Sequence, residues 1–357
     1  MSKKSALHIS KGVDSAPSIN PRLRAKARKT QGAEELLEGI LSGDLAALAR
    51  GITLVESRAE KDRAPAKDLL QAALPHSGKA LRIGISGVPG VGKSTFLENY
   101  GCRLLSTDSQ TRIAVLAVDP SSSKNQGSIL GDKTRMVELG KHPRAFIRPS
   151  ASGGALGGVA RATKEAMILC EAAGFSHIFV ETVGVGQSET LVAQLVDCFL
   201  FLAMPGTGDE LQGMKKGIME MADVIAMNKS EGQRRSAAER SALEIRRALQ
   251  LFTKENDAWI TPVTLISGLE GEGFEELDHV LDRYERHHKI KGLFEKKRAE
   301  QRVFWFERAL GEGVDQLLSS NLNWKSAKVE VREKVAQGKL SPFEASEMLL
   351  ERLRENF

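Results

Sequence analysis

The sequence predicts a doubly wound α/β fold with a mainly parallel sheet, flanked by helical segments. Two observations predict it. Short runs rich in β-branched and aromatic residues alternate with longer amphipathic segments over the middle of the chain. The runs are almost continuously apolar, as expected of strands covered by helices on both faces. We expect strands at residues 81–85, 113–118, 178–180, 199–203, 224–227 and 262–266.

Helical periodicity precedes this region. Leu45, Leu48, Ile52 and Val55 recur at spacings of 3, 4 and 3, which is the period of one helical face. We therefore predict a helical segment over residues 31–78, packed against the rest of the protein.

A second helical region follows the α/β domain, which we place at residues 79–285. Phe306, Leu310, Val314 and Leu317 recur at helical spacing. A last helix is expected from Ser341, with Pro342 at its first position and Glu344 completing a capping box. Residues 286–357 are thus predicted to be a helical appendage.

Positive charge is concentrated in residues 1–30, which carry eight basic side chains and one acidic side chain. The whole chain has a net charge of +5, so residues 31–357 sum to −2. This distribution argues against a basic nucleic-acid-binding fold, and we expect no nucleic-acid partner. The first 30 residues have few large apolar groups, which predicts a flexible basic tail. An Arg-rich, acid-poor leader is also typical of an organellar transit peptide, so a mitochondrial-matrix location stays open beside a bacterial cytoplasmic one.

The cysteine count favours a reducing compartment. Cys102, Cys170 and Cys198 are too few and too scattered for a disulfide framework or a zinc site. The longest apolar stretch, residues 198–204, has seven residues, whereas a membrane-spanning helix needs about 20. We expect no membrane association.

A phosphate-binding loop is the most specific motif in the chain. Residues 87–94 match G-x-x-x-x-G-K-[ST] and stand between the first expected strand and a helix expected from Thr95. The loop's backbone N–H groups and the helix N-terminus would bind phosphates, with Lys93 reaching the β- and γ-phosphates and Ser94 binding Mg²⁺. The nucleotide-binding residues predicted here are Gly87, Val88, Pro89, Gly90, Val91, Gly92, Lys93, Ser94 and Thr95.

Carboxylates at two strand ends are candidates for the second metal anchor. Asp119 and Glu181 each close an expected strand, and Asp132 lies in a Gly-Asp-Lys-Thr-Arg segment. Mg²⁺ prefers oxygen ligands in octahedral geometry, so these acids are predicted to complete its site. Capping of a following helix is the alternative for all three. The Gly184 amide is placed to sense a γ-phosphate, and Gln187 is the candidate for orienting the attacking water.

The segment that follows the expected strand at 224–227 predicts guanine recognition. Asn228, Lys229 and Glu231 resemble an Asn-Lys-x-Asp element, with glutamate in place of aspartate. A carboxylate there accepts hydrogen bonds from guanine N1–H and N2–H₂, while the lysine stem covers the ring. The loop expected to support the base, at the next strand end, is Ser267, Gly268 and Leu269. Together these residues favour GTP and GDP over adenine nucleotides.

These motifs, in their order along the chain, resemble the MeaB/ArgK family of P-loop GTPases. The resemblance runs from about residue 35 to 320 and includes the segments at 87–95, 119–122, 127–136, 181–189 and 204–216. The family includes the methylmalonic aciduria type A protein and lies near the nickel-insertion GTPases.

The resemblance implies a homodimeric GTPase that chaperones adenosylcobalamin-dependent methylmalonyl-CoA mutase or a related acyl-CoA mutase. It implies that nucleotide state gates the loading of intact cofactor and the release of damaged cofactor. Residues 210–216 would belong to a mobile third switch that faces the mutase, and the C-terminal helices would form a dimerisation arm. Lys93, Asp119, Glu181 and Gln187 would be the catalytic set, and hydrolysis would be slow without the partner.

Three alternatives stay open. One is an ATP-dependent kinase or ATPase linked to amino-acid transport, because a phosphate loop alone does not exclude phosphoryl transfer to protein. Another is a metallochaperone GTPase, although the seven histidines are dispersed and form no Cys/His cluster. The third is a scaffold that binds nucleotide without hydrolysing it.

Overall fold

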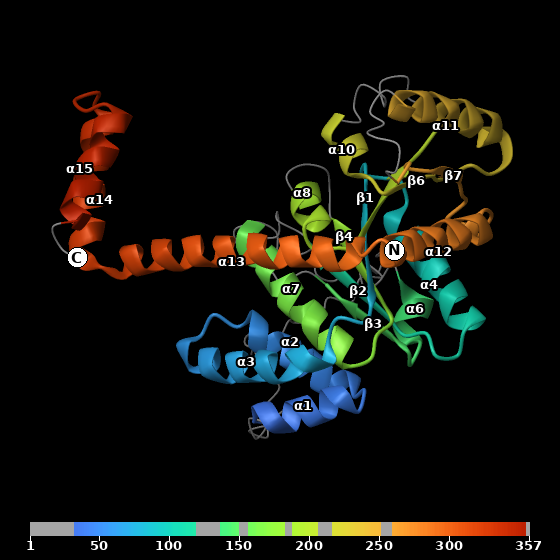
Figure 1. Cartoon of the computed structure of the whole chain (residues 1–357), viewed down its shortest axis with the longest axis horizontal. Helices are drawn as coiled ribbons and strands as arrows, with labels where there is room; N and C mark the ends of the chain where they lie inside the picture. Colours follow the sequence, from blue (N-terminus) through green and yellow to red (C-terminus); the bar gives the residue numbers. More distant parts are fainter. Residues whose placement is uncertain are drawn as a thin grey trace, which may run out of the picture.

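The computed structural model describes residues 32–118, 136–149, 156–182, 188–205, 216–250 and 259–354. Its centre is a seven-stranded, all-parallel sheet in the order β3-β2-β4-β1-β5-β6-β7 (Figure 1). The strands are β1 (Leu81–Gly87), β2 (Ile113–Val118), β3 (Ala145–Arg148), β4 (His177–Thr182), β5 (Cys198–Ala203), β6 (Val224–Met227) and β7 (Val263–Leu265). The expected doubly wound α/β fold is confirmed.

The short strand β3 is absent from the six expected strands. Its four residues, Ala-Phe-Ile-Arg, pair with β2 at one edge of the sheet. Only Ala145 is fully buried, and the run ends on Arg148. An edge strand has one neighbour and needs little apolar length, so it leaves a weak sequence pattern.

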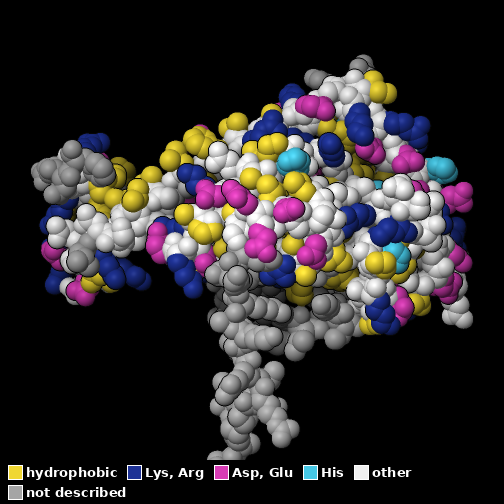
Figure 2. All heavy atoms as spheres, turned by 90° about the horizontal axis from the view of Figure 1, so that it is seen from below, with side chains coloured by type: hydrophobic (Ala, Val, Ile, Leu, Met, Phe, Trp, Pro, Cys, Tyr) yellow, Lys and Arg dark blue, Asp and Glu magenta, His cyan; other side chains and the backbone are white. Residues whose placement is uncertain are grey.

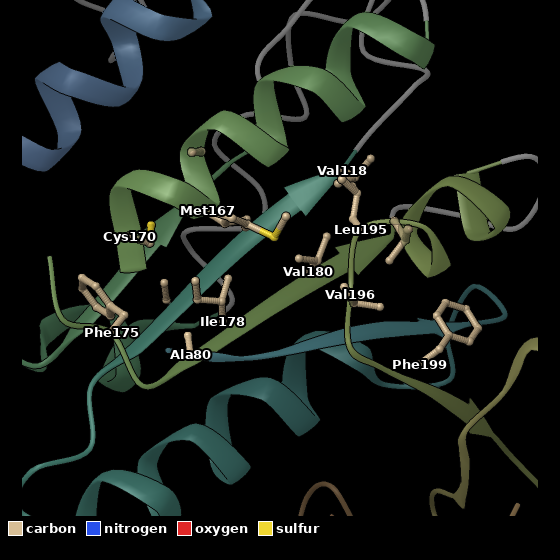
Figure 3. Close-up of a cluster of buried hydrophobic side chains, with 14 of the residues drawn as sticks. Ala80, Val118, Met167, Cys170, Phe175, Ile178, Val180, Leu195, Val196 and Phe199 are labelled. Carbon is tan, nitrogen blue, oxygen red and sulfur yellow. The ribbon is translucent and has the colours of Figure 1, made fainter. Parts of the chain in front are cut away.

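Helices cover both faces of the sheet. One face packs against α4 (Lys93–Thr107), α6 (Val137–Lys141) and α12 (Phe274–Ile290), and the other packs against α7 (Leu156–Ala172), α8 (Ser188–Ala193), α10 (Lys216–Met221) and α11 (Arg235–Gln250), which η2 (Gly232–Arg234) precedes. Successive strand residues point to opposite faces, as in β4, where Ile178 and Val180 face one core and Phe179 faces the other. Figure 3 shows Met167 and Cys170 of α7 pointing into the core that contains Ile178 and Val180.

The N-terminal helices form an additional layer outside α7 (Figure 1). They are α1 (Ala33–Leu41), α2 (Leu45–Glu56), α3 (Glu60–Ala73) and the short η1 (Leu74–His76). Leu48, Ile52 and Val55 are buried in the α7 core, as their spacing predicts. At Gly51, a Cβ would lie 2.9 Å from Ile40 Cδ1, so the glycine permits the close approach of α2 to α1.

The C-terminal region is a long helix that runs past the body and carries two shorter helices at its far end (Figure 1). These are α13 (Leu293–Ser320), α14 (Leu322–Ala336) and α15 (Pro342–Arg354). The expected start of the last helix is confirmed, and the amide of Glu344 donates to Ser341 Oγ at 3.2 Å. No helix of the described residues is long and apolar enough to span a membrane.

The first part of α13 is anchored to the body by side chains from successive turns. Arg298 Nε donates to Asp197 Oδ1 at 2.7 Å, and Gln301 Nε2 donates to the Val196 carbonyl at 2.8 Å. Trp305 Nε1 donates to the Gln194 carbonyl at 3.0 Å. The domain bounds at residues 78 and 285 stay predictions, as does the tail at 1–30, which lies outside the described residues.

Candidate functional site: a guanine-nucleotide centre

The phosphate-binding motif forms the turn between β1 and α4, at the carboxyl end of the central strand of the sheet. Gly87 has a φ of +154°, and a Cβ on it would lie 2.4 Å from the Leu202 carbonyl oxygen of β5. Gly92 has a φ of +98°, and its Cβ would lie 2.9 Å from Asn228 Nδ2. Both positions require glycine, because a side chain would strain the backbone and collide with the neighbouring strand ends.

The helix α4 begins at Lys93, two residues before its expected start. Its first N–H groups therefore point into the loop, where an anion is favoured. The Lys93 ammonium lies over the loop and donates to the Gly87 carbonyl at 2.8 Å. This position keeps the cation beside the backbone that would surround a phosphate.

Glu181 lies beside the phosphate loop because β4 is the immediate neighbour of β1. Glu181 pairs with Ile85 in the register of the two strands. Its side chain is buried, and Ser94 Oγ donates to Glu181 Oε1 at 3.3 Å. On the next residue, Thr182 Oγ1 donates to Ser86 Oγ at 3.0 Å and joins the same two strands. The structure thus brings together a hydroxyl and a carboxylate, the oxygen ligands that Mg²⁺ prefers.

Asn228 connects the end of β6 to two loops. It is 2% exposed, and its Nδ2 donates to the Val91 carbonyl of the phosphate loop at 2.8 Å. Its Oδ1 accepts a hydrogen bond from the Gly268 amide at 2.7 Å. The amide side chain therefore holds the phosphate loop and the predicted base-supporting loop in one arrangement.

Lys229 and Glu231 follow in the same segment. Lys229 has a φ of +60°, a conformation that non-glycine residues rarely adopt and that is common at functional sites. Its ammonium donates to the Gly90 carbonyl at 2.7 Å, so its stem crosses the gap between the two loops. Glu231 Oε2 is shielded from solvent and accepts no hydrogen bond from the residues that the structure describes. This oxygen is available as an acceptor.

The predicted base-supporting loop is a tight turn after β7. Ser267 Oγ accepts from the Glu270 amide at 3.0 Å, and the side chain of Leu269 is exposed. Asn99 of α4 donates from Nδ2 to the Gly268 carbonyl at 2.7 Å. Sequence reasoning missed Asn99, because it lies outside every motif and is brought to the turn only by the packing of α4.

Comparison with known proteins identifies the relatives of this site. The family model described as "Methylmalonyl Co-A mutase-associated GTPase MeaB" matches residues 48–323. The chain belongs to the MeaB family of GTPases. It is 46% identical to a putative GTPase of Caulobacter vibrioides over 317 residues, which are 89% of this chain and 96% of the relative.

Two further relatives bear on the fold and the family. This MeaB-family chain is 42% identical to the mitochondrial methylmalonic aciduria type A homolog of Mus musculus over 327 residues, 89% of this chain and 78% of the mouse protein. A crystal structure of a LAO/AO transport system kinase superposes with a TM-score of 0.72 at 35% identity, covering 90% of this chain and 97% of the other. The protein is a P-loop GTPase that binds guanine nucleotide.

Several predicted site residues lie outside the described part of this MeaB-family chain. They are Asp119, Asp132, Gly184, Gln187 and residues 210–215 of the expected third switch. The described site consists of the phosphate loop with Lys93, the Ser94–Glu181 pair, and the base-side residues held by Asn228.

In this GTPase, α4 is held against α12 by polar contacts of its middle turns. The hydroxyl of Tyr100 donates to Asp278 Oδ1 of α12 at 2.7 Å, and Arg103 forms an ion pair with the same carboxylate at 2.9 Å. Burial, and then the nearby Asp278, raise the pKa of Tyr100 well above its usual value, so the hydroxyl stays a donor. This contact fixes the direction in which the α4 N-terminus points.

Proposed function

We propose that the protein is a GTP-dependent chaperone of adenosylcobalamin-dependent methylmalonyl-CoA mutase or a related acyl-CoA mutase. In this proposal, nucleotide state gates cofactor loading and the protection or reactivation of the mutase. The observation that supports it most is the side chain of Asn228, which links the phosphate loop to the base-side loop. The chain that contains this link matches a mutase-associated GTPase family. A site of this kind changes shape with the nucleotide and can pass that change to a partner.

Mg²⁺ is the metal that we assign to this site. Ser94 Oγ and Glu181 would hold it, with Asp119 and Asp132 as further candidate ligands. When bound, the ion would neutralise the charge that develops on the transferred phosphoryl group. Lys93 would hold the phosphate oxygens, and Gln187 is the residue that we propose to orient water. We expect hydrolysis to be slow until the partner orders the switch segments.

The C-terminal arm supports a homodimer. Phe306, Leu310, Val314 and Leu317 share one face of α13, and all four side chains are exposed. Figure 2 shows hydrophobic side chains along the arm, where it projects from the body. An apolar stripe of this length is costly in water, and a second arm of the same chain would cover it.

Hydrolysis assays with and without a methylmalonyl-CoA mutase test the chaperone proposal. We expect a complex with the mutase and faster GTP turnover in it, with little turnover of ATP. Lys93→Ala should abolish nucleotide-dependent effects while complex formation persists. Absence of both complex formation and rate stimulation would overturn the chaperone role. The dimer is tested separately by analytical ultracentrifugation of Leu310→Asp, which should sediment as a monomer.

A kinase is the second candidate, favoured by one observation. A solved relative that superposes with a TM-score of 0.72 is described as a transport-system kinase. Transfer of radiolabel from [γ-³²P]ATP to protein would support this function. Release of all the label as inorganic phosphate would exclude it. A metallochaperone role finds no such support, since the described residues contain no group of three or more His, Cys, Asp or Glu placed to hold a metal ion.

A further inference from the structure

A cavity lies at the amino-terminal end of β1, opposite the phosphate loop. Its volume is about 490 Å³. Its walls come from the turn after η1, the first residues of β1, the helix α7, the turn after α8 and the anchored part of α13. None of the predicted nucleotide-site residues lines it, so it is a separate feature of the molecule.

Two of the cations in this cavity are already neutralised by buried carboxylates. Arg82 donates from Nε and Nη2 to the two oxygens of Glu171, both at 2.9 Å. Arg298 binds both oxygens of Asp197 in the same way, at 2.7 and 2.6 Å. The Glu171 and Asp197 side chains are fully buried, and each also accepts a hydrogen bond from one backbone amide, that of Gly78 and that of Arg82 respectively. Each carboxylate thus neutralises one arginine of the cavity wall.

The positive charge left over belongs to Lys164 and Arg302. Neither forms an ion pair with any carboxylate in the described part of the chain. The carboxylate next to Lys164, Glu165, binds Arg161 at 2.9 Å instead. Burial, and then the charges of Arg82 and Arg302, lower the pKa of Lys164 to about 8. Two unneutralised cations thus face a partly buried space, and an anion placed between them would relieve their repulsion.

The rest of the wall is apolar. Leu74, Met167, Ile168 and Leu195 line the cavity, and the indole ring of Trp305 lies 5.8 Å from Lys164 Nζ. Glu295 is a carboxylate on the same wall. This carboxylate disfavours a ligand with several negative groups, so one acidic group and an apolar body fit the lining best.

We propose that this cavity binds a small organic anion, whose single acidic group is held by Lys164 and Arg302 and whose apolar or aromatic body packs against Met167 and Trp305. The acidic group is a carboxylate or a phosphate ester. The ligand would contact α7, the turn after α8 and α13 at once. Because Gln301 and Trp305 join α13 to that same turn, binding should also stabilise the base of the C-terminal arm.

Calorimetric titration with two probes tests the site. The probes are 3-phenylpropionate and phenyl phosphate, added to full-length protein saturated with GDP and Mg²⁺ so that the phosphate loop is filled. We expect saturable binding, with the tighter probe identifying the acidic group, and no binding of benzylamine. Lys164→Gln and Arg302→Gln should each weaken binding about tenfold or more, because each removes a charged hydrogen-bond donor. Glu295→Gln should tighten it.

Control variants separate this site from other binding. Lys61→Gln replaces an exposed lysine on α3 and should leave the affinity unchanged. Thermal unfolding of each variant confirms that it folds, and the tighter probe should raise the midpoint of the wild type but not of Lys164→Gln. Failure of both probes to bind the wild type at millimolar concentration, or wild-type affinity in both Lys164→Gln and Arg302→Gln, would overturn the proposal.

Discussion

The side chain of Asn228 accepts a hydrogen bond from the Gly268 amide at 2.7 Å, and its other end donates to the phosphate loop. The residue is buried at the carboxyl end of β6, between two loops that lie about 140 and 40 residues away in sequence. One amide group therefore aligns the part of the site that binds phosphate with the part that we propose to bind the base.

Asn228→Ala should destabilise the protein and weaken nucleotide binding together. The change leaves the Val91 carbonyl and the Gly268 amide without their partner, which costs about 1–3 kcal/mol for each buried group. Urea unfolding and GDP titration measure the two effects. Asn99→Ala is the matched control, since it removes the hydrogen bonds from Nδ2 to the Gly268 and Leu269 carbonyls of the same turn and leaves the phosphate loop untouched. Equal losses in both variants would contradict a linking role for Asn228.

Ser94→Ala should change the magnesium dependence of GTP hydrolysis. The hydroxyl is one of the two oxygen groups that the structure places beside the phosphate loop, so its loss should raise the Mg²⁺ concentration for half-maximal rate by about tenfold. The neighbouring residue Thr95 is exposed and makes no such contact with Glu181, so Thr95→Ala should keep the Mg²⁺ requirement of the wild type, whatever its effect on nucleotide affinity. An unchanged Mg²⁺ requirement in Ser94→Ala would remove this residue from the metal site.

Glu231→Gln should reduce discrimination between GTP and ITP. Inosine lacks the 2-amino group, so a carboxylate that accepts from N1–H and N2–H₂ gains more from guanine than from hypoxanthine. The available Oε2 atom of Glu231 fits this role. We expect the wild type to bind GTP at least tenfold more tightly than ITP, and the variant to bind the two nearly equally. If the preference survives, another residue reads the 2-amino group.

Lys164 should make stability rise with pH on the alkaline side. Its pKa in the folded protein is about 8, below the usual value of 10.5, because burial and the cations Arg82 and Arg302 disfavour the charged form, with Glu165 opposing them. The unfolded chain therefore binds more protons between about pH 8 and pH 10.5, and the free energy of unfolding increases through that window. Lys164→Met should flatten this increase in urea unfolding measured from pH 7.5 to 10. A slope equal to that of the wild type would show that Lys164 is not the source.

The strands that sequence predicts are the ones buried on both faces. Runs such as residues 113–118 and 199–203 are apolar at every position, because helices cover each side of the sheet. The edge strand β3 has one fully buried residue and ends on a charge, so local composition does not mark it. Strand prediction therefore succeeded for the interior strands and for β7 at one edge, where Val263 and Thr264 are buried, and failed for β3 at the other edge.

The site follows a similar division. The phosphate loop can be recognised in the sequence because one continuous segment, residues 87–94, supplies its glycines, its lysine and its hydroxyl. Asn99 has no such signal, since its contact with the turn at Gly268 spans 169 residues of sequence. The same holds for Ser86 and Thr182, whose hydrogen bond joins two strands 96 residues apart.

By itself, the sequence predicted the α/β class and the two helical extensions, which the structure confirms, and it supplied the phosphate-loop motif and the base-side residues that we propose for the site. Each of these is encoded in a short continuous segment, where spacing and residue type report directly on backbone conformation. Only the tertiary structure decided that Glu181 lies against Ser94, that Asn228 links two loops, and that Lys164 and Arg302 face one cavity. Those relationships depend on the strand order, which places residues far apart in the chain side by side and which no local pattern encodes.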